Sequence, residues 1–315
     1  MAAFDKVLVV TQKTALEELI ERYNTRDQAR FYVEHMGVSF DGYQAAHDAY
    51  RNAVNLLTRS LPQGVRHQFI DRSFLPTFLF GECDLVVALG RDGLVANTAK
   101  YLKGQPLVGL NPDPERIDGV LLPFPISKAD SVLNDVVAGK YTAREVTMAQ
   151  ASLNDGRTLL AVNDLFLGQR THTSARYRIA VGDRAEDQSS SGVIVSTGAG
   201  STGWYRSILA GAAGVVEEFG GPKVVRAIRE KYRFDWEARE LRFTVREPFV
   251  SKTSRAGLVC GSVAEGKELV ITSQMPRDGV IFSDGIEADR LEFNSGGVVK
   301  IGVAARRLRL VDRCG

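Results

Sequence analysis

The order of apolar runs divides this chain into two kinds of sequence. Up to about residue 125, short strand-like runs alternate with segments of helical composition or spacing. The runs lie at Val7–Val10, Val65–Ile70, Asp84–Leu89 and Pro106–Leu110, and the helical segments at Thr14–Arg22, His47–Arg59 and Leu94–Leu102. This alternation predicts an α/β domain with a parallel sheet covered by helices.

The second half has a different pattern. Its apolar runs are short and are separated by Gly, Asn, Asp and Ser, which predicts a β-rich, mostly antiparallel domain. The runs lie at Val146–Leu153, Thr158–Val162, Tyr177–Val181, Val193–Ser196, Leu241–Val245, Glu268–Ile271 and Val280–Phe282, and a segment of helical composition interrupts them from Tyr205 to Tyr232. The proline-rich stretch from Asn111 to Pro125 is the best boundary. We therefore predict domains at residues 1–125 and 126–283, with 284–315 as a C-terminal segment.

Composition narrows the function classes. The chain has 315 residues and a net charge of +2, which gives no electrostatic case for nucleic acid or an anionic membrane as a partner. Three widely spaced cysteines and four scattered histidines show no metal-ligand spacing, so we expect no metal ligands. The cysteine content fits a reducing compartment, and the N-terminus lacks a signal-peptide pattern. We expect a cytoplasmic protein.

Two small-residue loops each follow an apolar run. Gly90-Arg91-Asp92-Gly93 follows one run, and Ser196–Trp204 follows another. Glycine lets the backbone turn sharply and approach a ligand, and consecutive N–H groups can bind an anion. The Asp92 carboxylate can accept a proton from a sugar hydroxyl or help to hold Mg²⁺ beside phosphates. The alternative is that Arg-Asp-Gly is only a turn.

The second loop contains Gly198-x-Gly200-x-x-Gly203, which matches the dinucleotide fingerprint. It lies in the β-rich half, and no second parallel strand follows at the expected distance, so we expect no Rossmann-type binding here. A tight loop before a packed helix is the alternative.

Two further polar groups interrupt apolar runs. Asn163-Asp164 can bind base and sugar hydroxyls, or can mark a bulge or turn between strands. Ser283-Asp284-Gly285 fits a strand-end turn, and the alternative is that it lines the ligand cleft.

These motifs, in this order, resemble those of the NAD kinase family, and especially its mitochondrial-type branch. The positions that carry the resemblance are Gly90-Arg91-Asp92-Gly93-Leu94, Asn111-Pro112-Asp113-Pro114-Glu115-Arg116, Asn163-Asp164, Thr197–Trp204, Arg246-Glu247-Pro248 and Asp284-Gly285. The resemblance implies a Rossmann-like N-terminal domain of the phosphofructokinase and diacylglycerol-kinase type, a C-terminal β-sandwich, and a tail that returns to the first domain.

The resemblance also implies an activity. A phosphotransferase of this family moves a phosphoryl group from ATP or polyphosphate, with Mg²⁺, to the 2′-hydroxyl of the adenosine ribose of NAD, giving NADP. By position, Asp92 is the catalytic residue and Gly90, Arg91 and Gly93 bind the donor's phosphates. The residues that bind NAD are Asn163, Asp164, Ser201, Thr202 and Trp204. A homodimer or homotetramer is implied, with nucleotides as the small-molecule partners.

The sequence departs from the family pattern at the donor loop. Arg91 replaces a glycine and Leu94 replaces a threonine, while Asp164 is one methylene shorter than the family's glutamate. An arginine can pair with donor phosphates or can obstruct them. The alternatives to an NAD kinase are a related kinase with another hydroxyl acceptor and a non-catalytic NAD-binding homologue.

Overall fold

The computed structural model describes residues 4–219, 225, 226, 228, 230 and 232–314. The chain forms two compact units, Met1–Arg144 with Arg309–Gly315, and Glu145–Leu308. The division falls after Arg144 rather than after residue 125, because the helix at Ala129–Val137 packs into the core of the first unit. Residues 284–308, predicted as part of the C-terminal segment, lie in the second unit.

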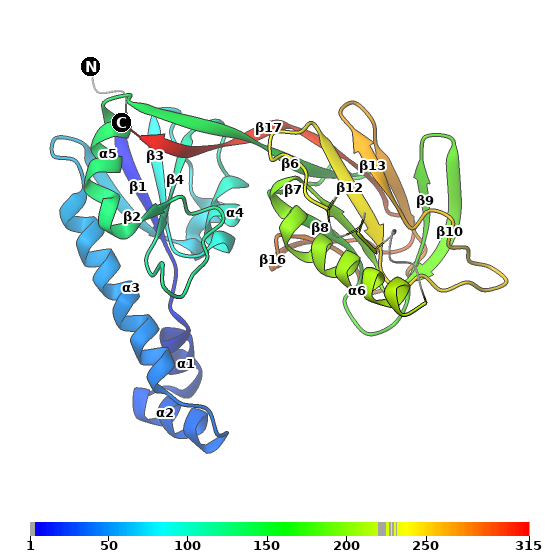
Figure 1. The fold of residues 1–315 in the computed structure, drawn as a ribbon, viewed down its shortest axis with the longest axis horizontal. Coiled ribbons are helices and arrows are strands. Elements are labelled where there is room, and N and C mark those ends of the chain that lie inside the picture. Colours follow the sequence, from blue (N-terminus) through cyan, green and yellow to red (C-terminus); the bar gives the residue numbers. More distant parts are fainter. Residues whose placement is uncertain (1–3, 220–224, 227, 229, 231, 315) are drawn as a thin grey trace. The chain divides into compact units, whose positions relative to one another are not determined.

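The first unit is built on a parallel sheet in the order β4-β3-β1-β2, with β5 and the end of β17 beside β4 (Figure 1). Its strands are β1 (Lys6–Thr11), β2 (Arg66–Asp71), β3 (Asp84–Leu89), β4 (Pro106–Asn111) and β5 (Phe124–Pro125). All six residues of β3 and all six of β4 are buried, as expected for a sheet covered on both faces. This confirms the predicted α/β fold.

Helices lie between and after the strands of the first unit. They are α1 (Ala15–Tyr23), α2 (Arg26–His35), α3 (Asp41–Ser60), α4 (Asp92–Ala99) and α5 (Ala129–Val137), with short 3₁₀ turns at Arg72–Thr77 and Ile126–Lys128. A capping box between Thr14 and Glu17 starts α1 directly after β1. The C-terminal half of α3 packs on the sheet through Tyr50, Ala53 and Leu57, while α1 and α2 form a separate small core with Phe40.

The second unit is a β-sandwich. One sheet has the order β13-β12-β11-β8-β15-β16, and the other joins β10, β9, β14, β17, β6 and β7. The strands are β6 (Tyr141–Leu153), β7 (Thr158–Ala161), β8 (Asp164–Gln169), β9 (Ala175–Val181), β10 (Arg184–Ser190), β11 (Val193–Ser196), β12 (Glu240–Val245), β13 (Cys260–Ala264), β14 (Leu269–Ser273), β15 (Gly279–Ser283), β16 (Ile286–Glu292) and β17 (Val298–Cys314). Alternate residues of both sheets fill the space between them, as in β8, where Leu165 and Leu167 face this core.

The outer face of the first of these sheets is covered by α6 (Trp204–Glu218), which follows the 3₁₀ turn Ala199–Thr202. Trp204 and Ile208 pack there against Phe166 and Phe282. The predicted helix from Tyr205 to Tyr232 is confirmed as far as Glu218, and residues 220–224, 227, 229 and 231 lie outside the described residues.

Candidate functional site

Candidate functional residues lie in both units, Gly90–Gly93 in the first and Asn163, Asp164 and Ser196–Trp204 in the second. In the first unit, the strand order places a topological switch between β1 and β3, because the chain passes from β1 to β2 on one side and from β3 to β4 on the other. Ligands of open α/β sheets bind at the carboxyl ends of strands at such a point. The loop Gly90–Gly93 leaves the carboxyl end of β3 there.

Asp92 is the first residue of α4, and Arg91 precedes it in an extended conformation. The Asp92 Oδ1 atom accepts a hydrogen bond of 2.7 Å from the backbone N–H of Leu121, which lies in the segment after β4. Its side chain is half-buried. Among the residues that the structure describes, Oδ2 of Asp92 has no hydrogen-bond partner, so one carboxylate oxygen is available to a ligand.

The two glycines of this loop differ. A Cβ atom at Gly90 would lie 2.8 Å from Cδ2 of Leu94, and the Gly90 N–H donates to the carbonyl of Leu110 at 3.3 Å. Gly90 is thus explained by packing, and Leu94, in place of the family's threonine, fills the space beside it. Gly93 is exposed, and a Cβ atom added there would have no neighbour within 4 Å, so its surroundings are open to a ligand.

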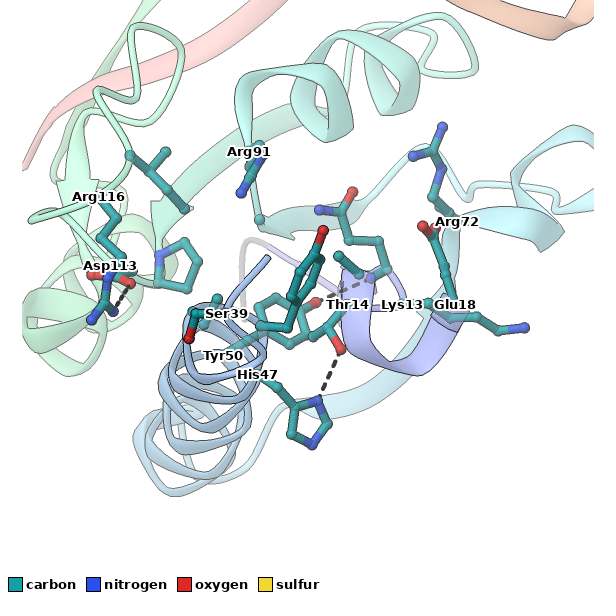
Figure 2. Close-up of a pocket in the computed structure, with 18 of the residues that line it drawn as sticks. Lys13, Thr14, Glu18, Ser39, His47, Tyr50, Arg72, Arg91, Asp113 and Arg116 are labelled. Carbon is teal, nitrogen blue, oxygen red and sulfur yellow. Dashed lines mark hydrogen bonds and ion pairs between the residues drawn. The ribbon is translucent and has the colours of Figure 1, made fainter. Parts of the chain in front are cut away.

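A cavity of about 550 Å³ lies in the first unit beside this loop (Figure 2). It is lined by residues that follow β1, β2, β3 and β4, and by α3 on another side. Tyr50 of α3 fixes the strand ends, because its Oη accepts from Gln12 N–H at 3.0 Å and donates to the carbonyl of Leu89 at 3.1 Å. Burial raises the pKa of Tyr50 to about 12, so this phenol stays neutral.

In the second unit, Asp284 organises the segment that carries Asn163 and Asp164. Its carboxylate accepts backbone N–H hydrogen bonds from Val162 (3.1 Å), Asn163 (2.7 Å) and Asp164 (3.3 Å). Asp284 and Gly285 both have positive φ, 55° and 70°, and form the two-residue turn between β15 and β16. The predicted turn at Ser283–Gly285 is therefore confirmed, and its aspartate also positions a loop about 120 residues away.

The Asp164 side chain is 8% exposed. Burial raises the pKa of its carboxyl to about 7, and the negative charge of Asp284 adds to the shift. No hydrogen bond to the Asp164 carboxyl is found within the described part of the chain. Asn163 is half-buried, and its side-chain amide likewise has no partner there. Both side chains retain hydrogen-bonding capacity for a ligand.

The loop Ser196–Trp204 is held by its own backbone. The N–H groups of Gly200, Ser201 and Gly203 donate to Thr197 Oγ1, Gly198 O and Gly200 O, respectively. A Cβ atom at Gly200 would lie 2.0 Å from the carbonyl oxygen of Asn163, and one at Gly198 would lie 2.0 Å from that of Asp235. Gly198 and Gly200 therefore serve close backbone packing, and these three N–H groups are bonded within the loop, whereas contact of the loop with a phosphate or ribose stays a prediction.

The loop nevertheless lies beside Asn163. Thr197 donates from its N–H to the Asn163 carbonyl at 2.9 Å, and its Oγ1 donates to the carbonyls of Val162 and Asn163. Ser201 is buried and its hydroxyl donates to Gly198 O at 2.6 Å, while Thr202 is half-buried. The structure thus brings Asn163, Asp164, the loop and Asp284 together.

Trp204 begins α6 and its indole lies in a stack of rings. It is parallel to Phe166 within 7° at 5.6 Å between centroids, and the Arg246 guanidinium lies 5.2 Å from its centroid. The indole is half-buried, so it is both a core side chain and an accessible one.

Within the described residues, no group of three or more His, Cys, Asp or Glu side chains could hold a metal ion. No helix among them is long and apolar enough to cross a membrane.

Comparisons with known proteins found several relatives and one similar fold. No protein-family model matches the chain. The NAD kinase of Heliobacterium modesticaldum is 34% identical over 180 residues, which cover 53% of this chain and 62% of that protein. The NAD kinase 2, mitochondrial, of Rattus norvegicus is 24% identical over 316 aligned positions, covering 78% of this chain and 74% of that protein. The crystal structure of yeast NADH kinase complexed with NADH has a TM-score of 0.63 at 13% identity, and the match covers 98% of this chain and 83% of that one.

The chain is therefore similar in sequence to NAD kinases and shares the fold of yeast NADH kinase. The match to the NAD kinase of Cupriavidus pinatubonensis, at 34% identity over 135 residues, spans 40% of this chain and 43% of that relative's length. The match therefore spans less than half of that relative. The motif positions that predicted the NAD kinase resemblance fall in both units, Gly90–Gly93 in the first and Asn163, Asp164 and Ser196–Trp204 in the second.

Sequence reasoning missed several residues of both groups. Arg72 follows β2 directly, as Arg91 follows β3, and the same strand-end argument identifies it. Tyr50 gives no signal, because a tyrosine on a helix is usually a packing residue. The three hydrogen bonds of Asp284 depend on the pairing of β15 with β8, which local sequence does not reveal.

Proposed function

We propose that this protein is a phosphotransferase that converts NAD to NADP. The 2′-oxygen of the adenosine ribose forms a bond to the terminal phosphorus of ATP or polyphosphate, and the bond from that phosphorus to its bridging oxygen breaks. The 2′-hydroxyl proton passes to the Asp92 carboxylate, and the donor leaves with one phosphate fewer. Positioning and electrostatics supply most of the catalysis in such transfers.

The position of Asp92 carries the proposal. A carboxylate at the carboxyl end of β3, half-buried and with Oδ2 unbonded within the described residues, is suited to accept a proton. Its other oxygen is tied to the N–H of Leu121, which keeps the side chain oriented before substrate binds. Arg91, next to it, lines the cavity and supplies a cation for donor phosphates. Gly93 leaves open space for them.

The second unit supplies the proposed NAD contacts. Asn163 has a free side-chain amide within the described residues, and Asp164 can accept or donate a hydrogen bond near neutral pH, since its pKa is raised to about 7. The half-buried Trp204 indole, which is stacked on Phe166, can contact a base through its exposed atoms. Thr202 contributes a hydroxyl, whereas the Ser201 hydroxyl already donates to Gly198 and can only accept from a ligand.

Magnesium fits this proposal as a companion of the donor. Mg²⁺ is usually held by one or two carboxylates together with substrate phosphates and water. The free Oδ2 of Asp92 would accept the proton, so Mg²⁺ would be held by the donor phosphates and water, where it would offset the phosphate charge. We also propose a cytoplasmic location, which the three free cysteines support. We further propose that the protein forms a homo-oligomer. Besides the family resemblance, the apolar side chains of Val215 and Phe219 on and after α6, 60% and 86% exposed, support association.

A coupled assay for NADP tests the function. The protein is incubated with NAD, Mg²⁺ and ATP, then with polyphosphate in place of ATP, and then with NADH in place of NAD. An NADP-specific dehydrogenase reports the oxidised product, and mass spectrometry reports NADPH. Turnover with any pair supports the proposal and identifies its donor and acceptor. If NAD binds in calorimetry and no pair gives product, the protein is not an NAD kinase.

A further inference from the structure

The cavity of the first unit collects arginines from separate strand ends. Arg72 follows β2, Arg91 follows β3 and Arg116 lies in the loop after β4, and all three line the cavity. Figure 2 shows Arg91 between Arg116 on one side and Arg72 on the other. The chain brings these residues together only because the three strands lie in one parallel sheet, in the order β4-β3-β1-β2.

Two of these guanidinium groups have no internal partner. Within the described residues, neither Arg72 nor Arg91 makes an ion pair or a side-chain hydrogen bond. Arg116 pairs with Asp113 at 2.8 Å, but its side chain is 55% exposed, and such surface pairs contribute only about 0–1 kcal/mol. Arg116 can therefore exchange Asp113 for another anion at small cost. Lys13, after β1, also lines the cavity, but its ammonium is bound to Glu21.

The span of the arginines indicates the size of the anion. The ends of β4 and β2 are separated by three strand spacings, or roughly 14 Å. A chain of several phosphates can contact side chains from both ends of this row at once. Arginine binds phosphate oxygens in pairs through its planar fork, which favours such a chain over a carboxylate ligand of the same charge.

We propose that Arg72 and Arg116, together with Arg91, bind the phosphoanhydride chain of the phosphoryl donor in this cavity. This inference rests on the proposed kinase function. Two donors share this chemistry, a nucleoside triphosphate and inorganic polyphosphate. Val38, Tyr43 and Ile117 add apolar wall to the cavity, which gives a purine base a surface that a free polyphosphate does not use.

The test is a binding measurement without NAD. Inorganic tripolyphosphate and ATP are titrated by calorimetry into the full chain and into the variants Arg72→Gln and Arg116→Gln. The control is Arg66→Gln, because Arg66 is an exposed arginine at the opposite end of β2 from Arg72. We expect each cavity variant to weaken tripolyphosphate binding at least tenfold, as for the loss of a charge-assisted hydrogen bond, and the control to change it less than twofold.

Each outcome separates this inference from the function. Equal loss in Arg72→Gln and Arg66→Gln, or no tripolyphosphate binding to the wild type, overturns the cavity assignment. If Arg72→Gln does not fold, Arg116→Gln decides, since the Arg116 side chain makes only its exposed contact with Asp113.

Tripolyphosphate binding without NADP formation supports the cavity assignment and rejects the kinase function. NADP formation with an unchanged donor KM in both variants rejects the cavity and keeps the kinase. Tighter binding of ATP than of tripolyphosphate would show that the apolar wall of the cavity contacts the base.

Discussion

Replacing Asp164 by Asn should stabilise the second unit at alkaline pH while it weakens NAD binding. Burial, and then the charge of Asp284, raise the pKa of the Asp164 carboxyl from 3.8 to about 7. In the unfolded chain this carboxyl ionises above its ordinary pKa, but in the folded chain it stays protonated up to about 7. The folded state thus binds more protons between these values, so stability falls as pH rises through that window and levels off above it.

The size of the effect follows from the shift. A difference of about three pKa units corresponds to about 4 kcal/mol at pH 8, and about 3 kcal/mol of it is lost between pH 5 and pH 8. Asparagine has a similar shape and cannot ionise. The stability of Asp164→Asn relative to the wild type should therefore increase by up to about 3 kcal/mol over the same range of pH.

Urea unfolding followed by tryptophan fluorescence measures this difference within the right unit. The chain has two tryptophans, Trp204 and Trp236, and both lie in the second unit. The control is Asp183→Asn, at an exposed aspartate of the same unit, which should show no pH-dependent gain. A gain for Asp164→Asn that is the same at pH 5 and pH 8 would refute the reasoning, because it would show that no buried charge is being removed.

Three further predictions follow from the same contacts. Asp284→Asn removes the neighbouring charge and should lower the pKa of Asp164, so the pH midpoint of NAD affinity should move down; an unmoved midpoint contradicts the coupling. Gly200→Ala places a Cβ 2.0 Å from a backbone carbonyl oxygen and should cost about 1–3 kcal/mol in urea unfolding, whereas Gly211→Ala on α6, with open space around it, should add up to about 1 kcal/mol. Arg91→Gly should raise the KM for the donor about tenfold and the KM for NAD much less, and a lower donor KM would show that the arginine obstructs the site.

The parts of the fold that depend on local pattern were predictable. The strands β1, β3 and β4 of the first unit are mostly apolar and alternate with helices, so their positions and parallel pairing follow from the sequence. The polar strands were missed. β10 reads Arg-Ala-Glu-Asp-Gln-Ser-Ser and is a strand because it pairs with β9 and because its buried Gln188 is hydrogen-bonded to Tyr177. Such tertiary contacts override the local preference for a loop.

The residues of the candidate site likewise fall into those that the local sequence predicts and those that depend on tertiary contacts. Residues at strand ends, such as Asp92 and the Asn163–Asp164 pair, could be selected because polar groups directly after or within apolar runs need partners. The packing role of Gly198 and Gly200 could not be predicted, because the same residue type serves either ligand approach or close backbone packing. Only the 2.0 Å distance from a Cβ at Gly200 to a backbone oxygen distinguishes these uses.

The most direct test of the account is the transfer of labelled phosphate to NAD, from γ-labelled ATP and separately from labelled polyphosphate, by the wild type and by Asp92→Asn. Calorimetry on both proteins shows that each still binds NAD. The account predicts labelled NADP from the wild type and at least about a hundredfold less from the variant, as for loss of a general base. Unlabelled NAD in both reactions would contradict the proposed kinase, and equal labelling in both would contradict the role of Asp92.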